Sequence, residues 1–598
     1  MKSTLLSRRD LDFLLYEWLR VDELTKRERF AEHSRDTFDD VLDLCEQLAT
    51  RYFAPHNKKS DANEPSFDGQ KVTVIREVKE ALDAFAAADL IGMGMDQTLG
   101  GAQLPMTVAE AGFAWFSAAN ISTTGYLMLT IANANLLAKF GSPDQIADYL
   151  KPMLAGRFSG TMALSETQAG SSLADILTRA EPQDDGTYRL FGSKMWISGA
   201  EHELTENIVN LVLAKIPGGP PGTKGISLFI VPKFLVDTGG SVGERNDVVL
   251  AGLNHKMGQR GITNTVLNFG EGQFRPGGMP GAVGYLVGEP HRGITYMFHM
   301  MNEARLGVGM GAVSLGYTGY LKSLEYARER PQGRPVTAKD PSTPQIPIIE
   351  HADVKRMLLA QKAYVEGGMA LLLYCAKLVD LQHSAESDHE RDATTLLLDI
   401  LTPVGKSWPS QWCLAANDLA IQVHGGYGYT REYDVEQHYR DNRLNPIHEG
   451  THGIQSLDLL GRKVTQRDGA SLAELGKVIG RTIAAATAAG GEQAELATQL
   501  KNAWQRLVDV TMAMFGSGDI DAALANSVTY LEAFGHIVVA WMWLEQYLAT
   551  QGRAGDFYDG KRQAARYFYR YELPRTAPQL GLLESLDRTT LEMRDGWF

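Results

Sequence analysis

The chain has 598 residues, of which 44% are apolar and 22% are charged, a composition typical of a soluble globular protein with several domains. Its net charge of −14 disfavours nucleic acid and anionic membrane surfaces as partners. The longest apolar run, Ile537 to Leu544, is far shorter than the roughly 20 residues of a bilayer span, so no membrane span is expected.

The chain begins with a helical region, residues 1–158. Apolar side chains recur at helical spacing in 11–20, and Ser142 followed by Pro143 predicts a helix start with a serine cap. The region 159–290 differs, because β-branched and apolar runs bounded by glycine and proline predict strands. These predicted strands cover 208–216, 225–231 and 263–269.

Helical patterns return in the region 291–465, with long helices expected at 305–330 and 354–379. A final helical region, 466–598, is rich in alanine and aromatic residues. Blocks of helices and strands that are segregated along the chain favour an α+β multidomain protein rather than an alternating α/β sheet. We therefore expect four domains with these boundaries.

The sequence carries no chemistry-bearing cysteine pattern. Cys45, Cys375 and Cys413 form no CxxC pair, so neither a disulfide framework nor a metal site is expected, and a reducing cytoplasm is the expected compartment.

Six short clusters could carry function, although each has an ordinary structural explanation by itself. Small residues in 160–172 would let main-chain N–H groups approach a ligand. Trp196 could lie against a flat ring, but a buried core tryptophan is the more common case. Arginines near helix ends are usually solvated or paired. The clusters are 160–172, 192–199, 302–305, 328–333, 422–429 and 440–451.

In this order and spacing, the clusters resemble the acyl-CoA dehydrogenase family over roughly residues 40–465. The segment Ile447-His448-Glu449-Gly450-Thr451 is the most specific match. The N-terminal start and the C-terminal extension resemble a long bacterial subgroup that includes fatty acyl-CoA and methylthiopropanoyl-CoA dehydrogenases. The resemblance implies an N-terminal helical domain, a middle β domain, a helical bundle and an extra C-terminal helical domain.

The resemblance also implies a role for particular residues. Glu449 would be the catalytic base that removes the α-proton of a thioester. Residues Ser171, Asn302, Arg305 and Gly450 would contact the acyl-CoA substrate. FAD would be bound by Met162, Leu164, Ser165, Gly170, Ser171, Trp196, Ile197, Ser198, Arg330, Gln422, Gly425, Gly426 and Thr451. By itself, Glu449 is explained equally well as an N-cap or a solvated residue before a helix near Thr451.

The expected reaction is FAD-dependent α,β-dehydrogenation of medium-to-long straight-chain acyl-CoA in fatty acid β-oxidation, with 3-methylthiopropanoyl-CoA as the second choice. An electron-transferring flavoprotein is the expected acceptor and a homodimer the expected assembly. An acyl-CoA oxidase and a DNA-associated flavoprotein on the same scaffold remain alternatives. Residues 466–598 hold 13 lysines and arginines against 16 aspartates and glutamates, which disfavours binding to DNA.

Overall fold

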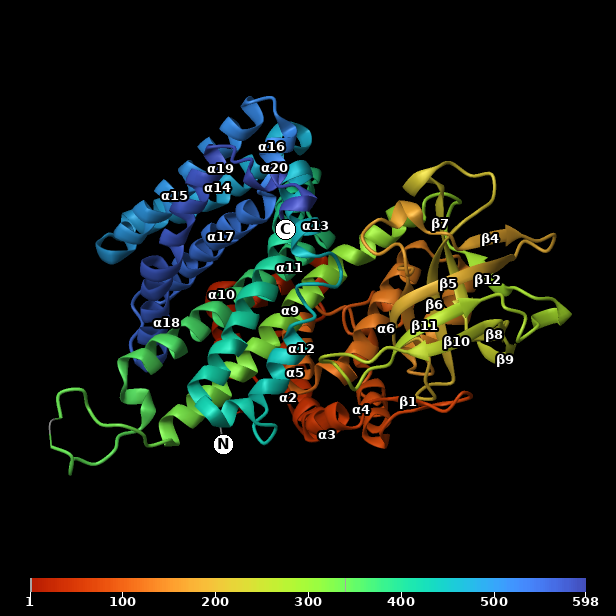
Figure 1. Ribbon diagram of the computed structural model, residues 1–598, viewed down its shortest axis with the longest axis horizontal. Coiled ribbons are helices and arrows are strands. Elements are labelled where there is room, and N and C mark those ends of the chain that lie inside the picture. The colour runs from red at the N-terminus through yellow and green to blue at the C-terminus, as the bar shows by residue number, and fades with distance from the viewer. Residues whose placement is uncertain (1–2, 339) are drawn as a thin grey trace. The chain divides into compact units, whose positions relative to one another are not determined.

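The computed structural model describes residues 3–338 and 340–598, and the side chains of 299–302 lie outside the described part (Figure 1). The chain divides into two compact units. Unit 1 comprises residues 1–35, 105–114 and 305–598, and unit 2 comprises residues 36–104 and 115–304. The α+β fold class expected from the sequence is confirmed, because the strands of the main sheet are confined to unit 2 and long helices dominate unit 1.

Unit 1 is built around long helices that pack over their apolar sides. Its helices are α9 (Gly293–Glu329, from Arg305 onward), α10 (Ala352–His383), α11 (Asp388–His424), α12 (Val435–Asn442), α13 (His452–Asp458), α14 (Gln466–Ala489), α15 (Gly491–Gly516), α16 (Ile520–Ala525), α17 (Ser527–Ala549), α18 (Asp556–Tyr567), α19 (Thr576–Glu584) and α20 (Thr589–Glu592). The helices α14, α17 and α18 pack against α10 or α11, and α15 and α19 pack against α17 (Figure 1).

Two features fix this packing. A Cβ added to Gly309 would lie 2.1 Å from the carbonyl oxygen of Gly405, so only glycine permits the close approach of α9 and α11. The indole of Trp543 on α17 is fully buried and donates to the carbonyl of Ala363 on α10 at 3.1 Å. The C-terminal helices are therefore an integral part of unit 1.

Buried ion pairs join the N-terminal segment to the same helices. Asp10 at the first helix, α1 (Arg8–Asp12), pairs with Lys561 of α18, which also pairs with Glu366 of α10 at 2.9 Å. All three side chains are almost completely buried. Breaking such a cluster leaves an uncompensated charge inside the protein, so it fixes the position of the N-terminus within unit 1.

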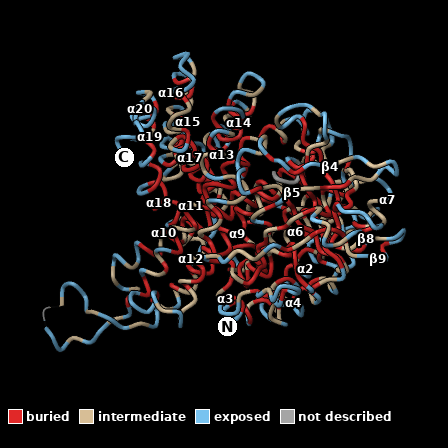
Figure 2. The backbone as a smooth tube through the Cα atoms, turned by 45° about the vertical axis from the view of Figure 1, so that its right-hand side comes forward, coloured by how far each residue is buried: buried red, intermediate tan, exposed pale blue. Residues whose placement is uncertain are grey.

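Unit 2 combines an eight-stranded sheet with helices. The sheet has the strand order β10-β11-β5-β12-β7-β6-β3, with β4 pairing to β5 and β6. The strands are β3 (Phe158–Ala163), β4 (Arg179–Pro182), β5 (Tyr188–Ser198), β6 (Asn207–Lys215), β7 (Ile226–Pro232), β10 (Val248–Leu253), β11 (Asn264–Phe269) and β12 (Ala282–Leu286). The apolar strands β3, β6 and β7 are buried along almost their whole length. Figure 2 shows buried backbone in red around α9 and exposed backbone in pale blue near β9 (Ser241–Arg245).

The helices of unit 2 include α2 (Arg35–Leu48), α3 (Asn57–Ala62), α4 (Arg76–Ala87), α6 (Ile121–Phe140) and α7 (Pro143–Gln145). The helix α6 packs against β3, since Asn133 donates to the carbonyls of Thr161 and Val209 at 3.2 and 2.9 Å. These bonds satisfy the buried side-chain NH2 group of Asn133 and fix the strand that precedes the expected cofactor loop.

Most of the expected elements are confirmed. The three predicted strands correspond to β6, β7 and β11, and Ser142 caps α7 through a reciprocal capping box with Gln145. One expectation is wrong: α9 does not open at 302–305 but begins at Gly293. The proline-containing segments 331–338 and 340–347 extend away from the helices of unit 1 (Figure 1). No helix in the described part of the chain is long and apolar enough to span a bilayer.

Candidate active site

Trp196 lies at an irregularity in the sheet of unit 2. Along β5, Ile197 pairs with Thr265 and Met195 pairs with Val266, so Trp196 is an extra residue opposite β11. Its φ of 66° is typical of such a bulge and unusual for a bulky residue. The side chain is 57% exposed, so the interpretation of Trp196 as a core tryptophan is wrong. A large aromatic side chain is thus presented on the surface of unit 2.

The neighbouring residues hold this bulge in place. Ile197 is buried in the sheet core, and its carbonyl accepts the hydroxyl of Thr265 at 2.9 Å. The Ser198 hydroxyl accepts from the amide of Asn264 at 3.0 Å, and the Ser198 carbonyl accepts from Thr161 at 2.6 Å. The Trp196 backbone is therefore held on its C-terminal side by bonds to two other strands.

The loop after β3 is anchored by a buried ion pair. Lys194 of β5 donates to Glu166 and to the carbonyl of Leu164, both at 2.9 Å, and neither charged side chain is more than 4% exposed. Glu166 also accepts the amides of Leu177 and Thr178 at 2.7 and 3.0 Å. Burial alone would raise the pKa of Glu166, but Lys194 and these hydrogen bonds lower that pKa to about 2. The charged carboxylate thus ties both ends of the loop to the sheet.

The predicted cofactor residues of unit 2 differ in exposure. Met162 is buried in the core beside α6, whereas Leu164 and Ser165 are half-buried where the loop begins. Gly170 and Ser171 are exposed, and a Cβ added to Gly170 would meet no other atom. The structure therefore presents Trp196, Ser198 and the loop from 164 to 171 on unit 2, while Met162 and Ile197 support them from the core.

Four of the predicted FAD-binding residues, Arg330, Gln422, Gly425 and Gly426, lie in unit 1. The α9 helix ends at Glu329, and the Arg330 guanidinium lies 5.4 Å from the ring centre of Tyr427. Gln422, Gly425 and Gly426 at the end of α11 are exposed. Gly425 has φ 62° and ψ −139°, a conformation that only glycine adopts readily, and an added Cβ on either glycine would meet nothing. Arg330 and the segment 422–429 thus lie close together in unit 1.

Glu449 lies in a strained turn before α13. Its φ is 52°, and that of the following Gly450 is 93°. The main-chain carbonyl of Glu449 accepts a hydrogen bond from the side-chain amide of Gln455 at 3.0 Å. The helix begins at His452, and its N-cap is Thr451, whose hydroxyl accepts from Ile454. The interpretation of Glu449 as the N-cap is therefore wrong. A glutamate held at positive φ without a capping role is a candidate for function.

Two buried cations from different helices influence Glu449. Arg305 of α9 is 3% exposed and pairs with Asp458 of α13 at 3.0 Å. Lys406 of α11 is fully buried and lies one residue after the Gly405 contact with α9. Burial raises the pKa of Glu449 above its usual range, and the charges of Arg305 and Lys406 oppose that rise. Asn302 precedes Arg305 on the same helix, but its side chain lies outside the described residues.

His448, the neighbour of Glu449, is held as a neutral ring. Its Nε2 lies 3.0 Å from the Asn445 side-chain oxygen, and Asn445 donates to Asn442, which donates to Asn417 of α11. Burial and the charge of Lys406 lower the pKa of His448 to about 3. His448 therefore adds no charge beside Glu449 near neutral pH.

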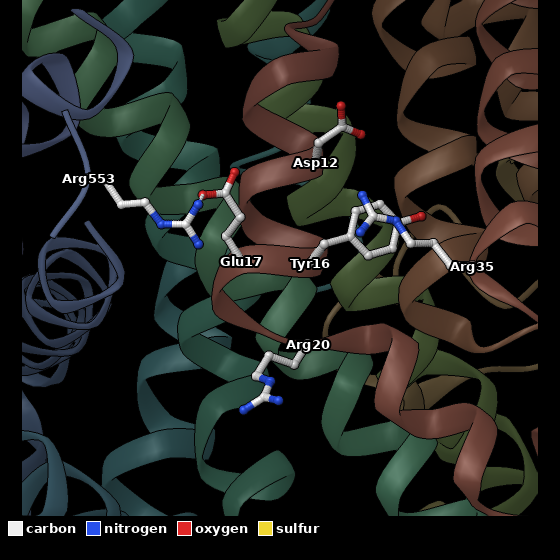
Figure 3. A pocket seen from close by; sticks show the side chains of 6 residues that line it. All are labelled: Asp12, Tyr16, Glu17, Arg20, Arg35 and Arg553. Carbon is white, nitrogen blue, oxygen red and sulfur yellow. Dashed lines mark ion pairs between the residues drawn. The ribbon is translucent and has the colours of Figure 1, made fainter. Parts of the chain in front are cut away.

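Figure 3 shows a separate pocket of about 550 Å³ in unit 1. It is lined by Asp12, Tyr16, Glu17, Arg20, Arg35 and Arg553. Its cations already have partners, since Arg20 pairs with Glu23 and Arg553 lies 3.4 Å from Glu17, and none of the predicted site residues lines it. This pocket therefore contributes nothing to the candidate active site.

The comparisons with known proteins identify the class of this chain. Family models match four successive regions: the acyl-CoA dehydrogenase N-terminal domain at 36–157, its middle domain at 161–270, its C-terminal domain at 291–464, and an acetyl-CoA dehydrogenase C-terminal-like domain at 474–594. The chain belongs to the acyl-CoA dehydrogenase family, and the resemblance seen in the sequence is confirmed.

Among similar proteins, the 3-methylmercaptopropionyl-CoA dehydrogenase of Ruegeria pomeroyi is 35% identical, over 88% of this chain and 87% of its own length. The broad-specificity linear acyl-CoA dehydrogenase FadE5 of Mycobacterium tuberculosis is 34% identical, over 99% of both chains. The structure of an acyl-CoA dehydrogenase from Bacillus anthracis complexed with FAD has a TM-score of 0.73 at 19% identity, covering 99% of this chain and 93% of that one.

Four residues with clear structural roles at the site were not assigned by the sequence analysis. Glu166 lies in the cluster 160–172 and Lys194 in the cluster 192–199. Their ion pair was not predicted, because it joins residues 28 positions apart in the chain. Lys406 lies in an apolar stretch of α11, where a lone lysine is a detectable signal of a buried charge. Asp458 carries no local signal, because only the fold brings it to Arg305.

Proposed function

We propose that this enzyme catalyses FAD-dependent α,β-dehydrogenation of an acyl-CoA thioester to the trans-2-enoyl-CoA, with Glu449 as the base. The observation that carries the proposal is the setting of Glu449, a carboxylate at positive φ whose pKa burial raises. A base for the weakly acidic α-proton works best when its pKa lies near the operating pH. The proton moves from the α-carbon to the Glu449 carboxylate.

The residues present fit a flavin. The exposed Trp196 offers an apolar surface for a flat ring, and the open main chain at Gly170 lets a ligand approach closely. In unit 1, Arg330 offers a cation for phosphate beside the open glycines Gly425 and Gly426. Bound FAD would accept the hydride that leaves the β-carbon. The protein's own residues bind and orient the cofactor and the substrate, and they hold the base in position.

Thr451 and Gly450 complete the proposed assignments in unit 1. Thr451 caps α13 and is exposed, and Gly450 at φ 93° follows the base directly. We assign Thr451 to FAD and Gly450 to substrate, together with Ser171, Asn302 and Arg305. The Arg305 guanidinium is already engaged by Asp458, so its proposed part is an electrostatic one toward bound thioester and Glu449.

For the substrate, we favour medium-to-long straight-chain acyl-CoA in fatty acid β-oxidation over 3-methylthiopropanoyl-CoA. The names of both similar proteins support acyl-CoA as the substrate class. FadE5, whose name denotes linear substrates, matches 99% of this chain, and the 3-methylmercaptopropionyl-CoA dehydrogenase matches 88%. We also propose four domains (1–158, 159–290, 291–465 and 466–598), a homodimer, a cytoplasmic location and an electron-transferring flavoprotein as acceptor.

Anaerobic reduction of the FAD-loaded protein tests this function. The protein is mixed with a series of saturated acyl-CoA thioesters from short to long chains and with 3-methylthiopropanoyl-CoA, and bleaching of the flavin is followed. We expect fastest bleaching with medium-to-long chains. Bleaching by 3-methylthiopropanoyl-CoA alone would make that compound, and not straight-chain acyl-CoA, the proposed substrate. No bleaching by any of these thioesters would refute the proposal.

Two further assays separate the alternatives. Turnover with electron-transferring flavoprotein is compared with peroxide production in air, and dominant peroxide production would identify an acyl-CoA oxidase. A gel-shift assay with duplex DNA at physiological salt tests the DNA-associated alternative. We expect no shift, because the C-terminal region carries a net charge of −3 and its arginines at 562, 566 and 570 flank buried aromatic residues rather than form an aromatic binding surface.

A further inference from the structure

Lys406 bridges the two ends of the turn that carries Glu449. Its ammonium group donates to the carbonyl oxygen of Asn445 at 2.8 Å and to that of Gly450 at 2.6 Å. The turn between these carbonyls consists of residues 446–449. One side chain from α11 therefore fixes the main chain on both sides of the proposed base.

The partners of Lys406 are unusual for a buried lysine. Its side chain is fully buried on α11, and in the part of the chain that the structure describes its hydrogen-bond acceptors are main-chain carbonyls, with no carboxylate in an ion pair. Transferring an ammonium group from water to the interior costs several kcal/mol. Methionine or leucine would avoid that cost but would leave the Asn445 and Gly450 carbonyls without this donor, so the part played by the buried charge lies in these two hydrogen bonds.

The turn needs such support because its backbone is strained. A non-glycine residue at positive φ is strained and persists only where its surroundings hold it. Glu449 has φ 52°, and its own carbonyl is held by Gln455 at 3.0 Å while the next carbonyl is held by Lys406. Lys406 and Gln455 together hold the backbone of the base in the left-handed conformation.

The charged groups around Glu449 come from several elements. Arg305 of α9 and Lys406 of α11 favour its charged form, and Asp458 of α13 pairs with Arg305. Burial and the charge of Lys406 lower the pKa values of His448 and His452 to about 3 and 4, so both rings are neutral near neutral pH. Lys406 thus acts on the base together with Arg305.

We propose that Lys406 is a positioning residue. It holds the 446–449 turn and favours the ionised form of the Glu449 carboxylate, which removes the α-proton. This inference rests on the proposed function of Glu449 as the base. Lys406 touches no substrate atom and exchanges no proton in this step, since the proton passes from the α-carbon to Glu449. Its two donated hydrogen bonds set the position of the base, and its charge favours the form of the base that can accept a proton.

The test compares Lys406→Gln, which keeps two N–H donors but no charge, with Lys406→Met and with the charge-keeping Lys406→Arg. The control is Lys463→Met, which removes another buried lysine of unit 1, 2.8 Å from Asp399 and outside the turn. For each FAD-loaded variant, the FAD content, the melting temperature, the acyl-CoA dissociation constant and the single-turnover rate of flavin reduction are measured as functions of pH.

We expect Lys406→Met to keep its FAD and its acyl-CoA affinity while the reduction rate falls about 10²-fold, the loss expected for a base misplaced by about 1 Å. In Lys406→Gln the acidic limb of the rate profile should move to higher pH, because loss of the cation raises the pKa of Glu449. Lys406→Arg should restore much of the rate. Lys463→Met should lower the melting temperature without changing the profile.

A Lys406→Gln enzyme with wild-type rate and pH profile would overturn the proposal, and this variant decides the matter if Lys406→Met does not fold. Equal losses of rate in Lys406→Met and Lys463→Met would also overturn it, by showing a general effect of lost stability. If no acyl-CoA reduces the wild-type flavin, the proposed function itself fails, and this inference fails with it.

Discussion

Replacement of Lys194 by methionine is expected to release the loop that carries Ser165, Gly170 and Ser171. The substitution keeps the bulk of the side chain but leaves the Glu166 carboxylate buried without its cation. Removing one member of a buried ion pair costs roughly 3–5 kcal/mol, because the remaining charge is neither solvated nor paired. The carboxylate would leave its buried position or take up a proton, and either change weakens its hydrogen bonds to the loop.

Amide hydrogen exchange measures this effect locally. The N–H groups of Leu177 and Thr178 donate to Glu166, so their protection reports on the pair directly. A loss of 3–5 kcal/mol corresponds to about 10²- to 4 × 10³-fold faster exchange, since each factor of ten is about 1.4 kcal/mol. The double substitution Lys194→Met with Glu166→Gln should recover part of the protection, because no charge is then left buried.

The pair also predicts a pH dependence in the acid range. The pKa of Glu166 is about 2 in the folded protein and near its usual 4.5 when unfolded. A lowered folded-state pKa contributes stability above the unfolded value, and this stability is lost as the pH falls from 4.5 towards 2. Unchanged exchange at Leu177 and Thr178 in Lys194→Met at neutral pH would refute the anchoring role.

Three further predictions concern single residues of the candidate site. Trp196→Ala should raise the FAD dissociation constant about fivefold to 150-fold through loss of stacking worth ~1–3 kcal/mol. The melting temperature of the apoprotein should change little, because the side chain is 57% exposed. An unchanged dissociation constant in a fluorescence titration would contradict this. Thr451→Ala should lower the free energy of unfolding by about 0.5–2 kcal/mol through loss of the α13 cap. Thr451→Ser, which keeps the hydroxyl, should change it little when both are measured by thermal unfolding. His448→Gln should leave the pH profile of flavin reduction unchanged between about pH 5 and 9, since the pKa of His448 is about 3; a shifted acidic limb would show that the ring is charged.

The helices and strands were largely predictable because their signals are local. The cap at Ser142 and the apolar runs that became β6, β7 and β11 depend only on neighbouring residues. The order of the six clusters was also sufficient to recognise the family. The start of α9 was misplaced, because the residues from Gly293 to Asn302 show no strong helix-start signal and belong to a longer helix.

The environment of the site residues was less predictable, because it depends on contacts between distant segments. Trp196 is exposed since one extra residue in β5 bulges opposite β11, a register that a single strand does not reveal. The capping interpretation of Glu449 failed because Thr451, two residues later, takes that role. Lys406 reaches the turn only through the packing of α11, 43 residues before Glu449 in the chain.

The central claim is that Glu449 is the base, and Glu449→Gln tests it most directly. Glutamine keeps the shape of the side chain and removes its ability to accept the α-proton. In an anaerobic single-turnover experiment with the best acyl-CoA, the variant should retain FAD and bind the thioester while flavin reduction slows by about 10²- to 10⁴-fold. Flavin reduction at the wild-type rate in this variant would contradict the account.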